Sequence, residues 1–213
     1  MVEQRDTLPY GLLRSHQGTV YAFDAGTVSL QLVSTGGEAE RAVFETLHTP
    51  DDLVRWLAGS PLAVDPVTAE VSDDDLAAAK RLREALWEIT TRRARAAEVP
   101  ATYLRTLNEV AAVPPLVPVL DADGTRRWAA PATGPAICST LARDAIDLLT
   151  GPGADRIRQC AGDTCALVFV DTSRPGRRRW CSMTRCGNLH KQRVFRSGRA
   201  IGGQSTGSRG QNA

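Results

Sequence analysis

Residues 160–186, which read CAGDTCALVFVDTSRPGRRRWCSMTRC, decide the fold of the C-terminal part of the chain. They contain two C-x4-C pairs, Cys160/Cys165 and Cys181/Cys186, separated by 15 residues. Two short cysteine pairs joined by a spacer of this size are typical of a zinc site with four cysteine ligands. A disulfide framework is the alternative, and it requires an oxidising compartment. The N-terminus, MVEQRD, has neither the basic leader nor the apolar stretch of a signal peptide, so we expect one structural Zn²⁺.

The sequence around the cysteine pairs predicts a small finger. Residues 166–170 form a β-branched and aromatic run that predicts a strand, and after a turn-rich segment residues 177–180 are expected to return as its partner. After the last cysteine, residues 189–199 have helical composition, and Asn188 is positioned to cap that helix. We call the Cys160–Cys165 segment the first knuckle and the Cys181–Cys186 segment the second knuckle. A hairpin between the two knuckles followed by a helix is a treble-clef-like arrangement. Its core is too small to hold without metal, so we expect the metal-free finger to be unfolded.

Three motifs in this region, CAGDTC, FVDTSRPGRRRWCSM and CGN, resemble the CGNR zinc finger of bacterial transcription regulators. The upstream sequence resembles the ABATE domain that accompanies this finger, and the similarity runs from about Tyr21 to Arg199. The resemblance implies a zinc-bearing, DNA-binding regulator of a family often described as stress-induced. The chain departs from the family pattern at Leu189, where the family has Arg. In the segment that corresponds to Leu-Asp-Phe-x-Asn-Thr, Gln31 replaces the acid and Ser34 the amide.

The net charge of +2 conceals a sharp asymmetry along the chain. From Gly151 onward there are 12 Lys/Arg and 3 Asp/Glu, whereas the first 150 residues hold 14 and 21. Four thiolates on Zn²⁺ still leave the C-terminal part strongly positive. A split of this kind indicates an anionic partner for the C-terminal part, and nucleic acid is the leading candidate because the charge lies on a folded finger. The alternative is a solvated tail that serves solubility.

The expected DNA surface combines the arginines of the hairpin with one face of the final helix. Arginine grips phosphates through charge and paired hydrogen bonds, and it also reads guanine edges in the major groove. Leu189 lies one helical turn before Arg193, so it removes one cation from this face and predicts weaker phosphate binding than in relatives. The residues that we expect to contact DNA are Arg177, Arg178, Arg179, Asn188, Lys191, Arg193 and Arg196.

The upstream part of the chain predicts a mostly α-helical domain with a small β component. Two capping boxes, Thr49 with Asp52 and Ser72 with Asp75, mark helix starts, and the second opens the longest helix of the chain. Further elements are expected as helices over 28–34, 101–112 and 136–150, a strand over 20–23, a β-hairpin over 116–128 around an Asp-Gly turn, an extended segment over 41–47 and a loosely ordered arm over 1–19.

The Gly151-Pro152-Gly153 break is the natural domain boundary. We expect a helical sensor or scaffold domain over 1–152, a zinc finger over 153–200 and a Gly/Ser/Gln-rich disordered tail over 201–213. Among single residues, Cys138 is expected to be a buried apolar residue, Trp180 to pack beneath the finger, and His190 not to bind the metal. The fold class is therefore mainly α with a small β component and a treble-clef-like finger.

Together these features predict a zinc-finger DNA-binding transcription regulator in the bacterial cytoplasm. The alternative is a zinc-stabilised module that docks a partner from the transcription machinery without direct DNA contact. Leu189 favours this alternative, because an exposed leucine beside arginines can anchor a protein partner. We do not expect an enzyme, because no nucleophile–base pair, paired acids or phosphate loop is visible, and four thiolates leave zinc no open position. No apolar stretch suits a membrane span. A homodimer would let a small finger read more DNA, although no heptad pattern supports one.

Overall fold

The computed structural model describes residues 8–15 and 17–202, with side chains as far as Phe195. The expected loose arm at residues 1–7, the disordered tail beyond Gly202 and the side chain of Arg196 therefore lie outside the described residues. Within the described part, the protein is mainly α-helical with a small β component, as the sequence predicts. No helix in this part is both long enough and apolar enough to span a bilayer.

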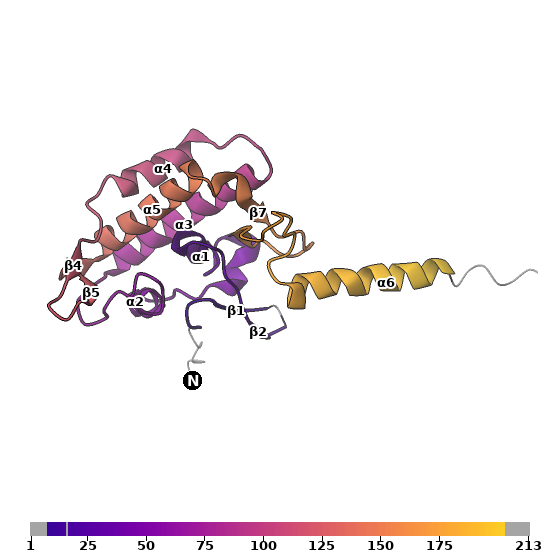
Figure 1. Ribbon diagram of the computed structural model, residues 1–213, viewed down its shortest axis with the longest axis horizontal. Coiled ribbons are helices and arrows are strands. Elements are labelled where there is room, and N and C mark those ends of the chain that lie inside the picture. The colour runs from indigo at the N-terminus through magenta and orange to yellow at the C-terminus, as the bar shows by residue number, and fades with distance from the viewer. Residues whose placement is uncertain (1–7, 16, 203–213) are drawn as a thin grey trace, which may run out of the picture.

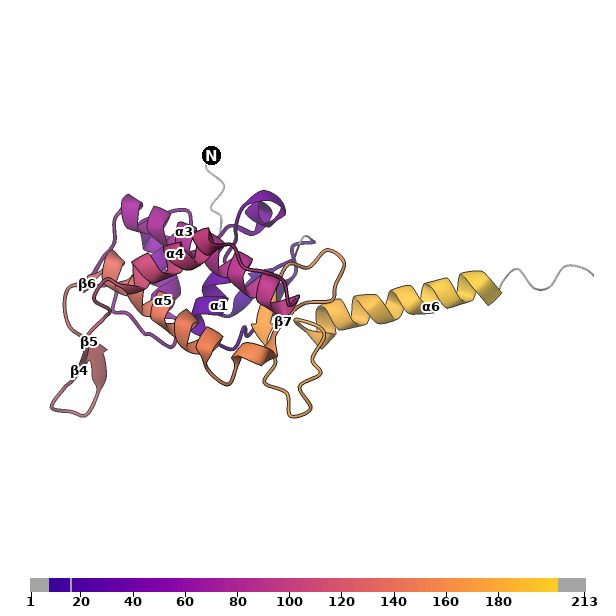
Figure 2. The ribbon, with the colours of Figure 1, turned by 90° about the horizontal axis from the view of Figure 1, so that it is seen from above.

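Three long helices lie side by side and form the body of the protein: α3 (Asp73–Ala94), α4 (Ala101–Ala111) and α5 (Gly134–Thr150) (Figures 1 and 2). The short helix α1 (Val28–Val33) packs against α3 and α5, and all six of its residues are buried. This burial explains why periodicity alone does not identify α1 as a helix. The helix prediction for this segment is confirmed. Helix α2 (Pro50–Ala58) packs on α3 from the outside.

Two of the helices begin at the capping boxes that the sequence predicts. At α2, the Thr49 hydroxyl accepts from the Asp52 N–H at 3.3 Å, and the Asp52 carboxylate accepts from the Thr49 N–H at 2.8 Å. Ser72 and Asp75 repeat the arrangement at α3, with distances of 3.2 and 2.9 Å. Each box satisfies two backbone donors that a helix start otherwise leaves without partners.

The strands form two-stranded pairs in the described residues. The hairpin predicted around the Asp-Gly turn is confirmed, because β4 (Pro118–Leu120) and β5 (Arg126–Trp128) pair in antiparallel fashion. The strand predicted over residues 20–23 is observed as β2 (Val20–Ala22). Strands β3 and β6 are parallel, and the other pairs are antiparallel. The pairs are β1 (Leu12–Arg14) with β2 (Val20–Ala22), β3 (Ala69–Glu70) with β6 (Ala132–Thr133), β4 (Pro118–Leu120) with β5 (Arg126–Trp128), and β7 (Ile157–Gln159) with β8 (Val168–Val170).

Two predictions for the first fifty residues are wrong. Residues 12–14, expected in a loose arm, form strand β1, which pairs with β2. The segment expected to be extended over 41–47 instead contains the 3₁₀ helix η1 (Ala39–Phe44). The cause is a long-range contact: the buried Arg41 side chain donates to the Gly36 carbonyl and pairs with Glu84 of α3, which draws the chain into a tight turn.

The predicted hairpin of the finger is also wrong. Strand β8 pairs with β7, which precedes the first cysteine pair, and not with residues 177–180. The latter segment is irregular, and the Ala161 N–H donates to the Arg179 carbonyl at 2.9 Å. All three residues of β8 are buried. Pairing with β7 places this apolar strand against α1 and α3, whereas the predicted hairpin would have left the strand on an isolated finger.

The finger and the helical domain therefore share one hydrophobic core. Phe169 is fully buried, and Ile157 and Val170 pack in the same cluster as the inner faces of α3 and α5. The Val170 N–H donates to the Ala25 carbonyl at 2.9 Å, just before α1. A side chain at Gly26 would lie 2.9 Å from the Val170 Cβ, so this close approach requires glycine there. The division of the chain after Pro152 stays a prediction, because the packing across it is continuous.

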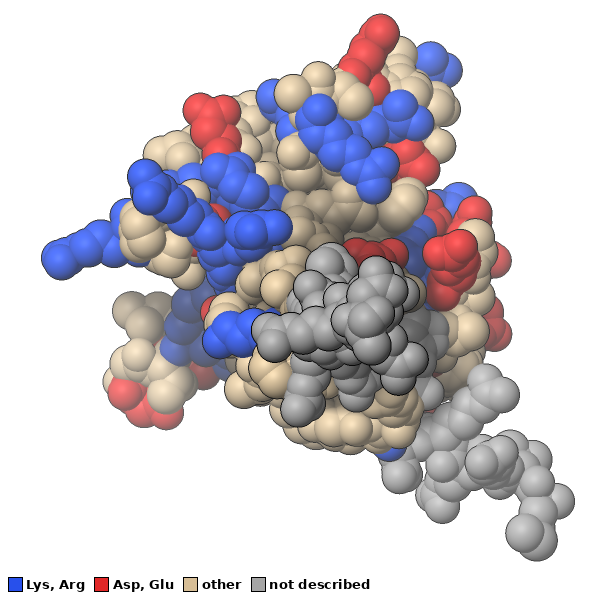
Figure 3. All heavy atoms as spheres, turned by 90° about the vertical axis from the view of Figure 1, so that its right-hand side faces the viewer, with Lys and Arg blue, Asp and Glu red and all other residues tan. Residues whose placement is uncertain are grey.

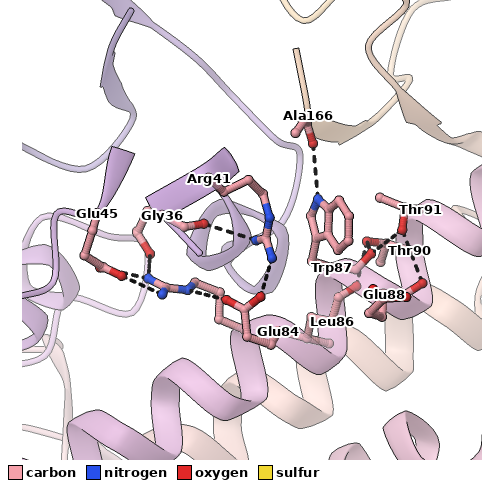
Figure 4. A network of polar contacts seen from close by, with 12 residues as sticks. Gly36, Arg41, Glu45, Glu84, Leu86, Trp87, Glu88, Thr90, Thr91 and Ala166 are labelled. Carbon is pink, nitrogen blue, oxygen red and sulfur yellow. Dashed lines mark hydrogen bonds and ion pairs between the residues drawn. The ribbon is translucent and has the colours of Figure 1, made fainter. Parts of the chain in front are cut away.

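A buried ionic network ties α3 to the segment that follows α1 (Figure 4). Arg83 is 2% exposed and holds both carboxylate oxygens of Glu45, at 2.9 and 2.6 Å. Arg41 pairs with Glu84, and its guanidinium lies 4.2 Å from the centre of the Trp87 ring. Burial alone would raise the pKa of the Glu45 carboxyl, but the hydrogen bonds and charge of Arg83 outweigh it and lower that pKa.

Gln31, which replaces the family acid, is satisfied in the core. Its side-chain oxygen accepts from the Ala25 N–H at 2.9 Å, and its amide nitrogen donates to the Phe23 carbonyl at 3.1 Å and to the Ser34 hydroxyl at 3.3 Å. A carboxylate at this position would accept from Ala25 but would have no donor for Phe23. In this chain the glutamine therefore fixes the loop that leads into α1.

The ionic network makes a test of stability. Glu45→Ala removes the carboxylate that accepts two hydrogen bonds from the buried Arg83 guanidinium and leaves it only a longer 3.4 Å carboxylate contact with Glu84, so we expect the free energy of unfolding to fall by about 3 kcal/mol. Glu109→Ala, which removes an exposed carboxylate on α4, should change it by less than about 0.5 kcal/mol. Urea denaturation of both variants measures the difference. A loss no larger for Glu45→Ala than for Glu109→Ala would contradict the assigned role.

Candidate metal centre

The four predicted cysteines meet at one point. The sulfur atoms of Cys160, Cys165, Cys181 and Cys186 all lie within 4.8 Å of one another, and three of the four residues are buried. The Cys165–Cys181 and Cys181–Cys186 sulfur pairs are 3.7 and 3.5 Å apart. Tetrahedral zinc with Zn–S bonds of about 2.3 Å requires sulfur–sulfur separations of about 3.8 Å. The donor set and its spacing therefore suit one structural zinc ion.

The first knuckle depends on its tight backbone. Cys160 follows β7 directly, and the Cys165 N–H donates to the Gly162 carbonyl at 3.0 Å, which turns the chain back on itself. A Cβ on Gly162 would lie 3.1 Å from the Cys186 sulfur. The Cys181 N–H donates to the Cys160 sulfur at 3.3 Å, which links the two knuckles and favours the thiolate form.

The second knuckle runs directly into the final helix. Cys186 lies in the π-helical turn η3 (Met183–Gly187), which continues into α6 (Asn188–Gly202). Asn188 has helical dihedrals, φ −68° and ψ −40°, and its side-chain nitrogen donates to the Thr184 carbonyl at 3.3 Å. The prediction that Asn188 caps the helix start is therefore wrong, because the chain is already helical at Met183.

The loop between the knuckles is held from within. The buried Asp171 carboxylate accepts from the Ser173 N–H at 3.0 Å and from the Arg178 N–H at 2.8 Å, and these hydrogen bonds fix the turn of the loop. The Arg178 guanidinium lies 4.1 Å from the Phe169 ring centre and donates to the Trp180 and Cys181 carbonyls. Arg178 is thus engaged in supporting the loop.

The other predicted basic residues lie at the surface. Arg177 and Arg179 on the loop and Lys191 on α6 are exposed, as is Asn188. Arg193 pairs with Asp163 of the first knuckle. Figure 3 faces the side toward which α6 projects: Lys and Arg side chains gather over the upper and left parts of this face, and a group of Asp and Glu lies toward its right edge.

The structure also places the three single residues His190, Trp180 and Cys138. The His190 ring stacks against Trp180 with centroids 4.8 Å apart, and it does not belong to the four-residue group. Trp180 is partly buried against the shared core. Cys138 is 3% exposed in α5, and burial raises the pKa of its thiol to about 12, which makes it an inert apolar residue.

Sequence reasoning missed one contact at the centre. Arg185, which precedes the ligand Cys186, donates to the Tyr21 hydroxyl of β2, and its guanidinium lies 4.7 Å from the centre of that ring. The two residues are 164 positions apart in the chain. No local pattern marks such a pair, and only the docking of the finger on the helical domain brings them together.

A closed four-sulfur centre mounted on a helical domain defines a zinc-finger protein. Residues 156–199 match the CGNR zinc finger, and residues 26–152 match the ABATE domain, described as "Putative stress-induced transcription regulator". The chain belongs to the ABATE family, and the resemblance noted in the sequence is confirmed. Neither of these is an enzyme family. No curated protein matches the chain.

The shared core predicts that metal removal unfolds only part of the finger. Strands β7 and β8 are anchored among the helices, whereas the two knuckles meet each other at the four sulfur atoms, which zinc holds together when it is bound. On chelation we expect hydrogen exchange to rise sharply at the Cys181 amide and to stay slow at the Val170 amide, which bonds to Ala25. Cys181→Ser should mimic chelation, and Cys138→Ser should not. Equal loss of protection at both amides would restore the expectation of a wholly unfolded finger.

Zinc affinity should depend steeply on pH. Hydrogen bonding among the crowded sulfurs lowers the pKa of the Cys160 thiol, chiefly through Cys165, and raises those of Cys165 and Cys181, chiefly through Cys160. At least two thiols must therefore lose protons when zinc binds. We expect affinity to fall by about 100-fold per pH unit on acidification from pH 7, as measured by chelator competition. A pH-independent affinity would contradict thiol protonation in the metal-free state.

Proposed function

We propose that the protein is a DNA-binding transcription regulator whose zinc-held finger presents a basic face to the duplex. The observation that carries the proposal is the gathering of cationic side chains around α6, which projects away from the helical body (Figures 1 and 3). Membership in a family of regulators supports it. Such a protein acts in the cytoplasm, where the bacterial chromosome lies.

The contact surface that we propose joins the loop to the helix. Arg177 and Arg179 approach phosphates from the loop, while Lys191, Arg193 and Arg196 do so from α6, with Asn188 at its start. The ion pair between Arg193 and Asp163 is exposed, and exposed pairs contribute only about 0–1 kcal/mol. A phosphate therefore competes readily with Asp163 for this arginine. We leave Arg178 out of the surface because its guanidinium is engaged with backbone carbonyls and Phe169.

Zinc acts in this proposal as a structural ion. When bound by the four cysteines, zinc fixes the direction in which α6 leaves η3 and the position of the loop between the two knuckles. The closed sulfur set leaves no position for a reacting water, so the proposed role is not enzymatic.

A second candidate function is docking to a protein of the transcription machinery. One observation favours it: Leu189, at the position of the family arginine, is 45% exposed on the basic face of α6. An exposed leucine beside arginines is a plausible anchor for a protein partner. In that case the finger would bind a partner protein with little dependence on salt.

The DNA proposal predicts a charge-specific loss of binding. Arg177→Glu with Arg179→Glu should weaken binding of the zinc-loaded protein to random-sequence duplex DNA by at least about tenfold, and should reduce the slope of log affinity against log salt by about 2. The matched control, Arg81→Glu with Arg105→Glu, makes the same charge change at exposed positions on α3 and α4. Fluorescence anisotropy across a salt titration measures both.

Two outcomes would contradict the DNA proposal. Equal losses in the two double variants would mean that binding reflects overall charge and not the finger. Absence of binding by the wild-type protein at low salt would remove DNA as the partner and favour docking to a protein.

A further inference from the structure

A pocket of about 710 Å³ opens where the helical domain meets the finger. Its lining comes from the β1–β2 ribbon, from the end of α1 and the residues that follow it, from η1, and from residues 164–167 and Arg185 of the finger. Small-molecule sites in proteins are typically concave, about 300–1,000 Å³ in volume and placed between domains. The size and position of this pocket meet both criteria.

The interior of the pocket is partly apolar. Leu13 from β1, Val33 from α1, Phe44 from η1 and Leu167 from the finger all contribute to its lining. These side chains come from four separate elements and enclose a space that suits an aryl ring or a short alkyl chain. The apolar body of a small molecule would find van der Waals contact on several sides.

Arg185 gives the pocket a cationic character. The half-buried Arg185 guanidinium stacks on the Tyr21 ring and donates one hydrogen bond to its hydroxyl. A guanidinium has five N–H donors, so further donors are available to a ligand. Arg14 on β1 also borders the pocket, but it pairs in register with Val20, on the face of the ribbon opposite to Leu13 and Tyr21, where it is exposed and donates to the Gly18 carbonyl at 3.2 Å.

The remaining charged residues of the lining are neutralised by partners. Both oxygens of Glu45 accept from Arg83, and Arg41 donates to the Gly36 carbonyl and pairs with Glu84 (Figure 4). The charge presented to a ligand therefore comes from Arg185, and it favours an anion. The neighbouring centre of Zn²⁺ with four thiolates carries a net negative charge, which disfavours a dianion relative to a monoanion.

We propose that this pocket binds a small organic monocarboxylate with a compact apolar body, its carboxylate held by the Arg185 guanidinium. A carboxylate accepts paired hydrogen bonds from a guanidinium, and Tyr21 holds the Arg185 side chain in place for that contact. The apolar body lies against Leu13, Val33 and Phe44. Binding is a property of the protein alone and does not depend on DNA.

The position of the pocket couples its ligand to the finger. Arg185 precedes the metal ligand Cys186, and Cys165 itself lines the pocket. At the finger's wall, the Trp87 indole N–H donates to the Ala166 carbonyl at a long 3.4 Å, which is a weak tether between α3 and the first knuckle (Figure 4). A ligand that repositions Arg185 or residues 164–167 therefore acts on both knuckles. This consequence for DNA affinity rests on the proposed function.

Nuclear magnetic resonance of the full-length, zinc-loaded protein tests the binding. Phenylacetate is the probe, and 2-phenylethanol is its uncharged counterpart of similar shape. We expect phenylacetate to shift the Arg185 Nε–H signal and the backbone amides of residues 164–167 saturably, and 2-phenylethanol to bind at least about tenfold more weakly. Absence of saturable shifts up to ~10 mM phenylacetate, or equal binding of the two compounds, would overturn the proposal.

Two variants assign the carboxylate contact. Arg185→Gln should weaken phenylacetate binding by about tenfold, and Arg179→Gln, in the finger but outside the pocket, should leave it unchanged. Tyr21→Phe, which lies away from the cysteines in sequence, removes the hydroxyl that holds Arg185, so it should weaken binding several-fold and serves as the test if Arg185→Gln loses zinc. The proposed contact would be contradicted by wild-type affinity in Tyr21→Phe together with either wild-type affinity or zinc loss in Arg185→Gln.

A DNA titration in saturating phenylacetate separates the site from its consequence. We expect the affinity for duplex DNA to change by at least about threefold. Unchanged DNA affinity with phenylacetate bound would refute the coupling between the pocket and DNA binding, and it would leave the proposed binding site intact. Phenylacetate binding by a protein that does not bind DNA at all would refute the proposed function and leave the binding site intact.

Discussion

The burial of strand β8 among the helices is the interaction on which the rest of the structure depends. Val168, Phe169 and Val170 are apolar and lie entirely in the interior, where they pair with β7 and contact α1 and α3. This packing fixes both ends of the first knuckle relative to the helical body. The zinc centre, the loop and α6 then follow from the positions at which β7 and β8 leave the core.

The sequence predicts the features that local chemistry determines. The four cysteines, both capping boxes and the Asp-Gly hairpin depend on residues close in the chain. The failures involve distant partners: β8 selects β7 because the helices cover it, and the Arg41 pair with Glu84 turns an expected extended segment into η1. The contact of Arg185 with Tyr21 is likewise invisible in the sequence.

A shared core also changes the functional interpretation of the finger. A finger on a flexible linker would bind DNA independently of its helical domain, whereas this one is mounted on α3 and contacts β2 through Arg185. Rigid mounting fixes the direction of α6, and it lets events in the helical domain reach the metal centre through a few side chains. The helical domain is thus positioned to act as more than a scaffold.

The most direct test of the account is hydrogen exchange of the zinc-loaded protein with and without a short DNA duplex. The account predicts that DNA slows exchange in residues 174–179 and in the first turns of α6, while exchange in α4 is unchanged. Protection confined to the helical body, or no protection at a DNA concentration that saturates binding, would contradict the claim that the finger's basic face is the DNA-binding surface.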